Sequence, residues 1–197
     1  MKSFEAKNFD HLLGTAGFSD NLLKNHFTLY QGYVKNVNLL IEELETLLKD
    51  GKMGMPSYAE LTRRFAWEFN GMRLHELYFG NMKKEGAALS QAGGLFENMC
   101  KLYGSYENWG KDFKAIGSMR GIGWAILYYD PISKKLFNVW VNEHDAGHLS
   151  GAAPLLVLDV FEHAYTLDYG IKKADYVQSF FNAIDWSVVE ARFGEKL

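Results

Sequence analysis

The sequence predicts an α+β protein in which an N-terminal antiparallel helical hairpin precedes an α+β domain with a small antiparallel three-stranded sheet. In the first half, two long stretches repeat apolar residues at helical spacing and are separated by a short loop. In the second half, aromatic and β-branched residues gather into three short runs typical of strands. A glycine-containing stretch, residues 83–94, separates the halves. We therefore expect two domains, residues 1–85 and 86–197.

The two long patterns predict the helices of the hairpin. The first follows Ser19, a favourable N-cap, and ends at Asp50, where a glycine-rich loop over residues 51–56 begins. Residues 57–60 read Ser-Tyr-Ala-Glu, so we expect a capping box to open the second helix, which then continues to about Met82. Because the loop is short, the two helices are expected to lie side by side and antiparallel.

The second half is expected to alternate short helices and strands. The sequence Asp-Pro-Ile-Ser at residues 130–133 predicts the turn of a β-hairpin, since turn residues separate two runs of strand-forming residues. The expected strands cover residues 123–129, 135–141 and 154–158. The expected helices cover residues 95–103, 106–117, 174–183 and 186–193.

The composition excludes several classes of function. The net charge of −3 provides no basic surface for a nucleic acid or an anionic membrane. The single cysteine excludes an intrachain disulfide and a cysteine-rich zinc site. No apolar run reaches the roughly 18–20 residues that cross a bilayer, and the first residues lack the apolar core of a signal peptide. We therefore expect a cytoplasmic protein with neither a nucleic-acid partner nor a membrane partner.

The most informative polar residues follow the apolar run 154–158. Asp159 ends this run and His163 lies four residues later. A buried carboxylate is costly unless a positive group neutralises it, and a metal ion shared with His163 would do so. His26 and His75 lie on the apolar sides of the two long helices, so a hairpin could add one imidazole from each. Nitrogen and oxygen ligands without a thiolate suit iron, manganese or zinc.

The segment that contains this pair carries a family resemblance. Residues 159–165 read D-V-F-E-H-A-Y and resemble the signature D-x-W-E-H-A-Y of the iron/manganese superoxide dismutase family. The resemblance covers residues 19–193, including blocks at residues 121–124 and 182–186. It implies a helical hairpin followed by an α+β domain, with the metal site between the two. It also implies a set of four metal ligands, which are His26, His75, Asp159 and His163.

The resemblance implies a superoxide dismutase, an enzyme that disproportionates superoxide to O2 and hydrogen peroxide while one metal ion per subunit alternates between M3+ and M2+. The ion must be redox-active, which excludes zinc and leaves iron or manganese. An alternative is a metal-binding relative of the same fold that does not dismutate and serves in metal sequestration or in structure.

Residues around the ligands bear on the choice of metal. Family members commonly place a glutamine beside the solvent ligand, whereas here Gly71 stands one turn before the ligand His75. His144, in the loop after the second strand, falls where archaeal-type members use a histidine. A histidine can donate or accept a hydrogen bond, and it would therefore tune the metal differently from an amide. On this resemblance we favour iron, or the use of either metal.

The resemblance also assigns pocket residues. Tyr33 corresponds to the gateway tyrosine, and together with His144 it is the expected catalytic pair. Tyr30 stands near a metal-proximal position, in a segment one residue shorter than usual. Trp124 and Phe161 are expected to wall the pocket, with Phe161 in place of the usual tryptophan. His148 is expected to lie outside the site.

Two further residues of the signature imply a second subunit. Glu162 and Tyr165 resemble family residues that reach across a dimer interface, where the glutamate pairs with the signature histidine of the partner. We therefore expect a homodimer or a homotetramer.

Overall fold

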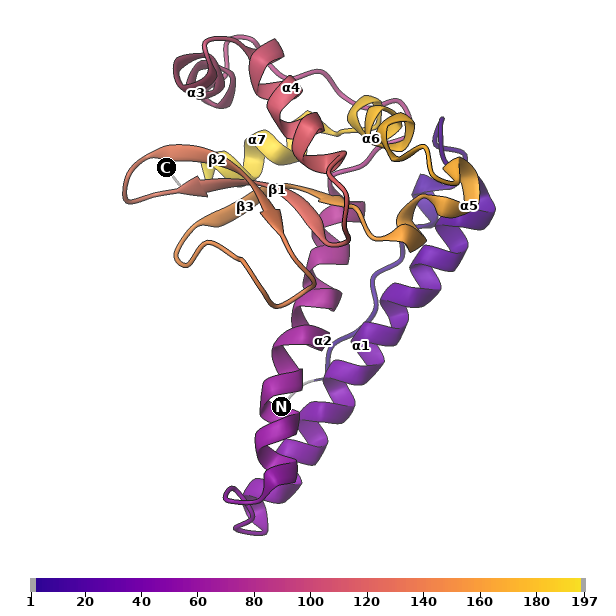
Figure 1. The fold of residues 1–197 in the computed structure, drawn as a ribbon, viewed down its shortest axis with the longest axis vertical. Helices are drawn as coiled ribbons and strands as arrows, with labels where there is room; N and C mark the ends of the chain where they lie inside the picture. Colours follow the sequence, from indigo (N-terminus) through magenta and orange to yellow (C-terminus); the bar gives the residue numbers. More distant parts are fainter. Residues whose placement is uncertain (1–2, 196–197) are drawn as a thin grey trace.

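The structure, a computed structural model, describes residues 3–195. It consists of a long helical hairpin with a helix-and-sheet half at one end (Figure 1). Helices α1 (Asp20–Lys49) and α2 (Pro56–Gly80) run antiparallel along each other, and the sheet half lies at the end away from their connecting loop. This arrangement confirms the predicted fold class.

The starts of the two long helices are built differently. The Ser19 hydroxyl accepts a hydrogen bond of 3.0 Å from the amide of Leu22, so α1 has the predicted side-chain cap. The predicted capping box of α2 is wrong, because its N-cap is Met55 and Pro56 is its first residue. Proline suits this position because its fixed φ is helical and its missing N–H would have no partner there. Ser57 therefore lies inside the first turn.

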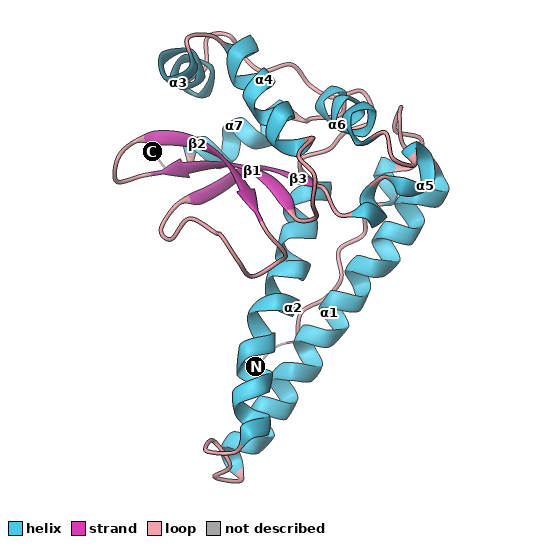
Figure 2. Ribbon diagram, viewed as in Figure 1, coloured by secondary structure: helices cyan, strands magenta, loops and turns pink. Residues whose placement is uncertain are grey.

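The remaining elements follow the predicted order (Figure 2). The expected strands are β1 (Trp124–Asp130), β2 (Lys135–Val141) and β3 (Ala153–Asp159). The expected helices are α3 (Gly94–Tyr103), α4 (Tyr106–Gly117), α6 (Lys173–Asn182) and α7 (Trp186–Gly194). Three short elements were not expected, namely the 3-10 turns Asp10–Leu12 and Glu162–Ala164 and the one-turn helix α5 (Thr166–Tyr169).

The sheet places the end of β3 beside the start of β1. Its strand order is β2-β1-β3, and both pairs are antiparallel. The central strand β1 is buried on both faces, and α4 packs against it. At one end of the sheet, Trp124 pairs with Val141 on one side and with Asp159 on the other. The register therefore brings an aromatic ring, a carboxylate and the beginning of the β2–β3 loop to one place.

Buried hydrogen bonds fix the sheet against the hairpin. The side chain of Asn81, which follows α2, accepts from the amide of Val157 at 2.9 Å and donates to the Val157 carbonyl at 3.3 Å. Arg192 of α7 donates to the carbonyls of Leu155 at 2.7 Å and of Leu77 at 3.1 Å. These contacts hold α2, β3 and α7 in register, and they fix where the end of β3 meets the helices.

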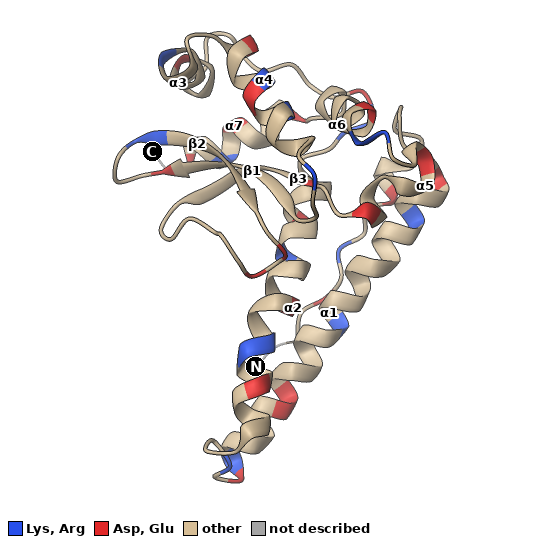
Figure 3. Cartoon of the chain, in the orientation of Figure 1, with Lys and Arg blue, Asp and Glu red and all other residues tan. Residues whose placement is uncertain are grey.

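The charged residues form no block of one sign in the view of Figure 3, where both signs are spread over the hairpin and the sheet half. Among residues 3–195, no helix is long and apolar enough to cross a membrane.

Candidate metal centre

Four side chains from four elements converge between the hairpin and the sheet. They are His26 of α1, His75 of α2, Asp159 at the end of β3 and His163 in the 3-10 turn. One ligand atom of each lies within 4.8 Å of all the others. The Nε2 atoms of His26 and His163 are each 3.2 Å from Asp159 Oδ2, and that of His75 is 3.5 Å away. The structure thus brings together all four residues of the predicted set.

Local hydrogen bonds orient the carboxylate. Asp159 Oδ1 accepts from the amide of Phe161 at 2.9 Å, and the Tyr176 hydroxyl donates to the Asp159 carbonyl at 2.7 Å. Oδ2 is thereby left facing the three imidazoles. The 3-10 turn Glu162–Ala164 folds His163 back onto the carboxylate, so a spacing of four residues becomes a direct contact.

The tautomer of His75 shows that the cluster suits a cation. Its Nδ1 lies 2.6 Å from the carbonyl of Gly71, which can only accept, so the proton of the neutral ring is on Nδ1. Nε2 then carries a lone pair that points at Asp159 Oδ2. It is a fully buried nitrogen without a hydrogen-bond partner among the residues that the structure describes. A buried acceptor facing a carboxylate is costly, and a metal ion bound to both atoms removes this cost.

The electrostatics keep the cluster in the form that a metal requires. Burial lowers the pKa of His26 and lowers that of His75 well below its usual range. Burial alone would raise the pKa of Asp159, but contacts with His163 and His26 outweigh it and hold this pKa well below its usual range. The folded protein therefore favours neutral His26 and His75 and an ionised Asp159, which are the protonation states that metal binding needs at these three residues. The donor set fits iron or manganese.

The lowered histidine pKa values predict that the metal-free protein loses stability in mild acid. Below pH 6.5, the unfolded chain binds protons at His26, His75 and His144 that the folded protein does not bind. Each histidine then lowers the free energy of unfolding by up to about 1.4 kcal/mol per pH unit. Urea unfolding at pH 5, 6 and 7 measures this slope, and His144→Gln should reduce it by one histidine's share. An unfolding free energy that is constant over this range would contradict the prediction.

A chain of hydrogen bonds links Tyr33, His144 and Trp124 beside the cluster. The Trp124 indole N–H donates to His144 Nδ1 at 3.1 Å, and His144 Nε2 lies 2.7 Å from the Tyr33 hydroxyl. Because the indole can only donate, neutral His144 carries its proton on Nε2 and donates to the Tyr33 oxygen. We expected a histidine that could donate or accept, whereas Trp124 fixes it as a donor toward Tyr33. The hydroxyl proton of Tyr33 remains free for another acceptor.

Both residues of this pair stay neutral over the ordinary pH range. Burial lowers the pKa of His144 to about 4, against the attraction of the Asp159 charge. Burial, together with the charge of Asp159, raises the pKa of Tyr33 to about 12. In the metal-free protein, Tyr33 therefore keeps its hydroxyl proton, and neutral His144 remains the donor to the Tyr33 oxygen.

Gly71 makes room for Tyr33. A Cβ atom at residue 71 would lie 2.5 Å from Cδ1 of the Tyr33 ring, closer than real Cβ contacts come. The Tyr33 ring instead lies against the ring of His75, with their centroids 5.2 Å apart and their planes at 29°. The absence of a side chain one turn before His75 is thus a packing requirement.

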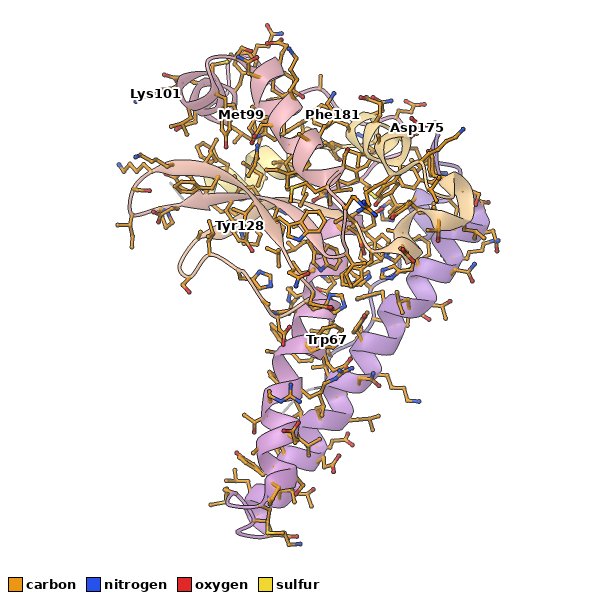
Figure 4. The ribbon with its side chains drawn as sticks, in the orientation of Figure 1. Trp67, Met99, Lys101, Tyr128, Asp175 and Phe181 are labelled. Carbon is orange, nitrogen blue, oxygen red and sulfur yellow. The ribbon has the colours of Figure 1, made fainter. Side chains whose placement is uncertain are left out.

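Aromatic rings pack around His144 and the cluster. Phe161 lies 4.7 Å from the ring of His144 and stacks on His163 at 5.3 Å, between centroids. Trp67 of α2, labelled in Figure 4, lies 4.7 Å from the ring of His144 and was missed by the sequence analysis. It precedes His75 by eight residues and so shares its helix face, a spacing that could have identified it.

The remaining predicted residues lie farther from the cluster. The ring of Tyr30 is 6.4 Å from that of His75, but its hydroxyl points away, donating to Glu76 at 3.1 Å. Glu162 is exposed. Tyr165 is buried against Tyr176 of its own chain, with ring centroids 5.4 Å apart.

Comparison with known proteins identifies similar sequences. Residues 91–192 match the family model described as iron/manganese superoxide dismutases, C-terminal domain. The chain is 40% identical to "Superoxide dismutase [Mn] 2" of Haloferax volcanii over 86% of this chain and 83% of the relative. It is 35% identical to "Superoxide dismutase [Fe]" of Saccharolobus solfataricus over 85% of this chain and 81% of the relative. It is 34% identical to "Superoxide dismutase [Fe]" of Pyrobaculum aerophilum over 88% of this chain and 82% of the relative.

Proposed function

The chain belongs to the iron/manganese superoxide dismutase family, and on this premise we propose that it disproportionates superoxide with one iron or manganese ion per chain. The proposed ligands are His26, His75, Asp159 and His163. The observation that carries the proposal is the buried His75 Nε2, whose lone pair faces Asp159 Oδ2 without a donor among residues 3–195. A cation bound by all four groups satisfies both atoms.

The ligand charges suit an anionic substrate. When bound, the ion would supply one-electron exchange, accepting an electron from one superoxide and returning it to a second. Three neutral imidazoles and the single carboxylate of Asp159 offset one unit of charge, so the centre stays positive in either valence. A positive centre in a pocket walled by Trp124 and Phe161 attracts a small anion more strongly than the same charge in water would.

Tyr33 and His144 are proposed to supply the protons that the peroxide needs. Two superoxide anions and two protons give one dioxygen and one hydrogen peroxide, so the peroxide must receive both protons. His144 donates to the Tyr33 oxygen, which leaves the Tyr33 O–H directed to another acceptor. A donated hydrogen bond also favours the tyrosinate that forms when this proton leaves. We therefore propose Tyr33 as the proton donor and His144 as the group that supports it.

Reconstitution of the purified protein tests this function. Separate samples loaded with iron, manganese or zinc are analysed for bound metal and for superoxide consumption. We expect about one ion per chain in each sample, and turnover with iron, with manganese or with both. The zinc form is the matched control, because zinc fills the same ligands without one-electron chemistry. Stoichiometric binding without turnover for both iron and manganese would refute the proposal and would favour a sequestration or structural role.

The metal is proposed to be iron, or either of the two ions. All four ligands are nitrogen or oxygen donors that suit both ions, and the relatives include proteins named for each. His144 beside the cluster supports the use of iron, by the resemblance to archaeal-type members. Activity per bound ion in the iron and manganese samples decides between them, and a manganese form that alone is active would exclude the preference for iron.

A homodimer, or a tetramer built from it, is also proposed. Glu162 is exposed beside His163, whose side chain is 31% exposed, so a partner could cover this edge of the cluster. In the segment that follows, the apolar residues Leu167 and Ile171 are 53% and 99% exposed. Sedimentation equilibrium should give twice or four times the mass of one chain, and Glu162→Arg should weaken the association. A monomer at micromolar concentration would exclude the proposal.

We also propose two domains and a cytoplasmic location. The division into domains at residues 85 and 86 accords with the place of the metal centre between hairpin and sheet. A cytoplasmic location is proposed from the composition.

A further inference from the structure

The loop between β2 and β3 carries His144 and is anchored by a second histidine. Residues 142–152 leave the sheet at Val141, and Glu143 has φ of 58°, a conformation that residues other than glycine rarely adopt. His148, four residues after His144, turns back onto this loop. Its Nε2 lies 2.8 Å from the carbonyl oxygen of His144, and its Nδ1 lies 2.7 Å from the Tyr128 hydroxyl.

The partners of His148 fix the direction of both hydrogen bonds. A carbonyl only accepts, so Nε2 of the neutral ring carries the proton and donates to the main chain of His144. Nδ1 then accepts from the hydroxyl of Tyr128, a residue of β1 that is 2% exposed. Figure 4 labels Tyr128 on the sheet, beside this loop. The second histidine thus joins the loop to the most buried strand of the protein.

β1 therefore holds His144 at two points. Trp124 binds the imidazole directly, and Tyr128 binds the main chain through His148. Trp124 and Tyr128 are four residues apart on one strand, and alternate residues of a strand point to the same face, so both reach the same loop. Two attachments fix the position and the tilt of the ring, whereas the indole bond alone would let it pivot.

From this geometry we propose that His148 is a positioning residue for the reaction. It holds His144 so that Nε2–H is directed at the Tyr33 hydroxyl, and its own hydrogen bonds go to Tyr128 and to the His144 carbonyl. The inference rests on the proposed function, since it concerns how the proton-donating pair is kept in place. It replaces the expectation that His148 has no part in the site. Displacement of a reacting group by about 1 Å can cost about 100-fold in rate.

The test compares His148→Phe, which keeps a ring but removes both hydrogen bonds, with His148→Gln, which keeps a donor and an acceptor. We expect the Phe variant to bind its metal and to lose about 10-fold in kcat, within the range contributed by residues that support the groups around a metal. The Gln variant should recover most of this loss. Tyr128→Phe, which removes only the outer hydroxyl, should reproduce the Phe effect in part, and it keeps the test valid if His148→Phe does not fold.

A double-mutant comparison separates positioning from general stability. If His148 acts through His144, then His148→Phe should have no further effect on kcat in a His144→Leu background. An equal loss in both backgrounds would overturn the proposal, because the residue would then act independently of His144.

A readout in metal-free protein distinguishes this inference from the dismutase proposal. The Trp124 indole N–H donates to His144, and 15N labelling of the five tryptophans makes this proton visible by NMR. His148→Phe should shift its signal and speed its exchange with solvent, whereas His148→Gln should not. An unchanged Trp124 signal in His148→Phe would overturn the positioning role. If the Trp124 signal shifts in His148→Phe but the metal-loaded wild-type protein shows no turnover, His148 does anchor the loop and the dismutase function is refuted.

Discussion

Asp159→Asn protein is expected to lose its metal and, with it, all superoxide turnover. The amide matches the carboxylate in size, but it removes the single negative charge among the four proposed ligands. The new amide N–H can also donate to His75 Nε2, and this hydrogen bond would occupy the lone pair that the metal needs. Changes to residues that merely support metal ligands cost about 10- to 100-fold in affinity, so removal of this ligand charge should cost more than about 100-fold.

Metal content after dialysis, with superoxide consumption on the same sample, measures this effect. Circular dichroism shows whether the variant folds. Asp175→Asn is the matched control, because Asp175 is an exposed residue of α6 outside the cluster (Figure 4), and it should change neither quantity. Asp159→Asn protein that retains one tightly held ion per chain would show that the carboxylate is not a ligand.

His144→Leu protein is expected to retain the metal but to lose about 100-fold in kcat, the lower end of what a positioned proton-transfer group contributes. Leucine fills the buried volume, yet it leaves the Trp124 indole without its acceptor and Tyr33 without its donor. His144→Gln should retain much more activity, because an amide can accept from Trp124 and donate to Tyr33.

Rates measured per bound ion separate this effect from a loss of metal. The comparison with His144→Gln matters, because it distinguishes the hydrogen bonds from the volume of the side chain. Equal rates in wild-type and His144→Leu protein would exclude a role for His144 in the proton supply, and a loss of metal from His144→Leu would indicate that it acts on the ligands instead.

Much of the fold could be predicted because its signals are local. The hairpin follows from apolar periodicity, and the Ser19 cap from a single hydroxyl within reach of the next turn. The predicted start of α2 was wrong for a physical reason. Both Pro56 and Ser57 are favourable near a helix start, and the proline takes the first position because its ring suits no interior one. The 3-10 turn at Glu162–Ala164 has no such local signal.

The four residues of the cluster could be predicted with the help of the family resemblance, but the hydrogen bonds around them could not. His26 and His75 stand out as imidazoles on apolar helix faces, and Asp159 as a carboxylate at the end of a buried strand. The bond between Tyr33 and His144 joins residues 111 positions apart, and it depends on a loop whose path the sequence does not specify. The direction of that bond depends in turn on Trp124, which reaches His144 only through the register of the sheet.

The cluster of His26, His75, Asp159 and His163 is proposed to support disproportionation of superoxide. Product stoichiometry tests it most directly, with dioxygen release and hydrogen peroxide measured together while iron- or manganese-loaded protein consumes a large excess of superoxide and no electron donor is present. We predict one dioxygen and one hydrogen peroxide for every two superoxide ions, sustained over many turnovers per chain. Consumption that stops after one superoxide per chain, or peroxide formed without dioxygen, would contradict disproportionation by this cluster.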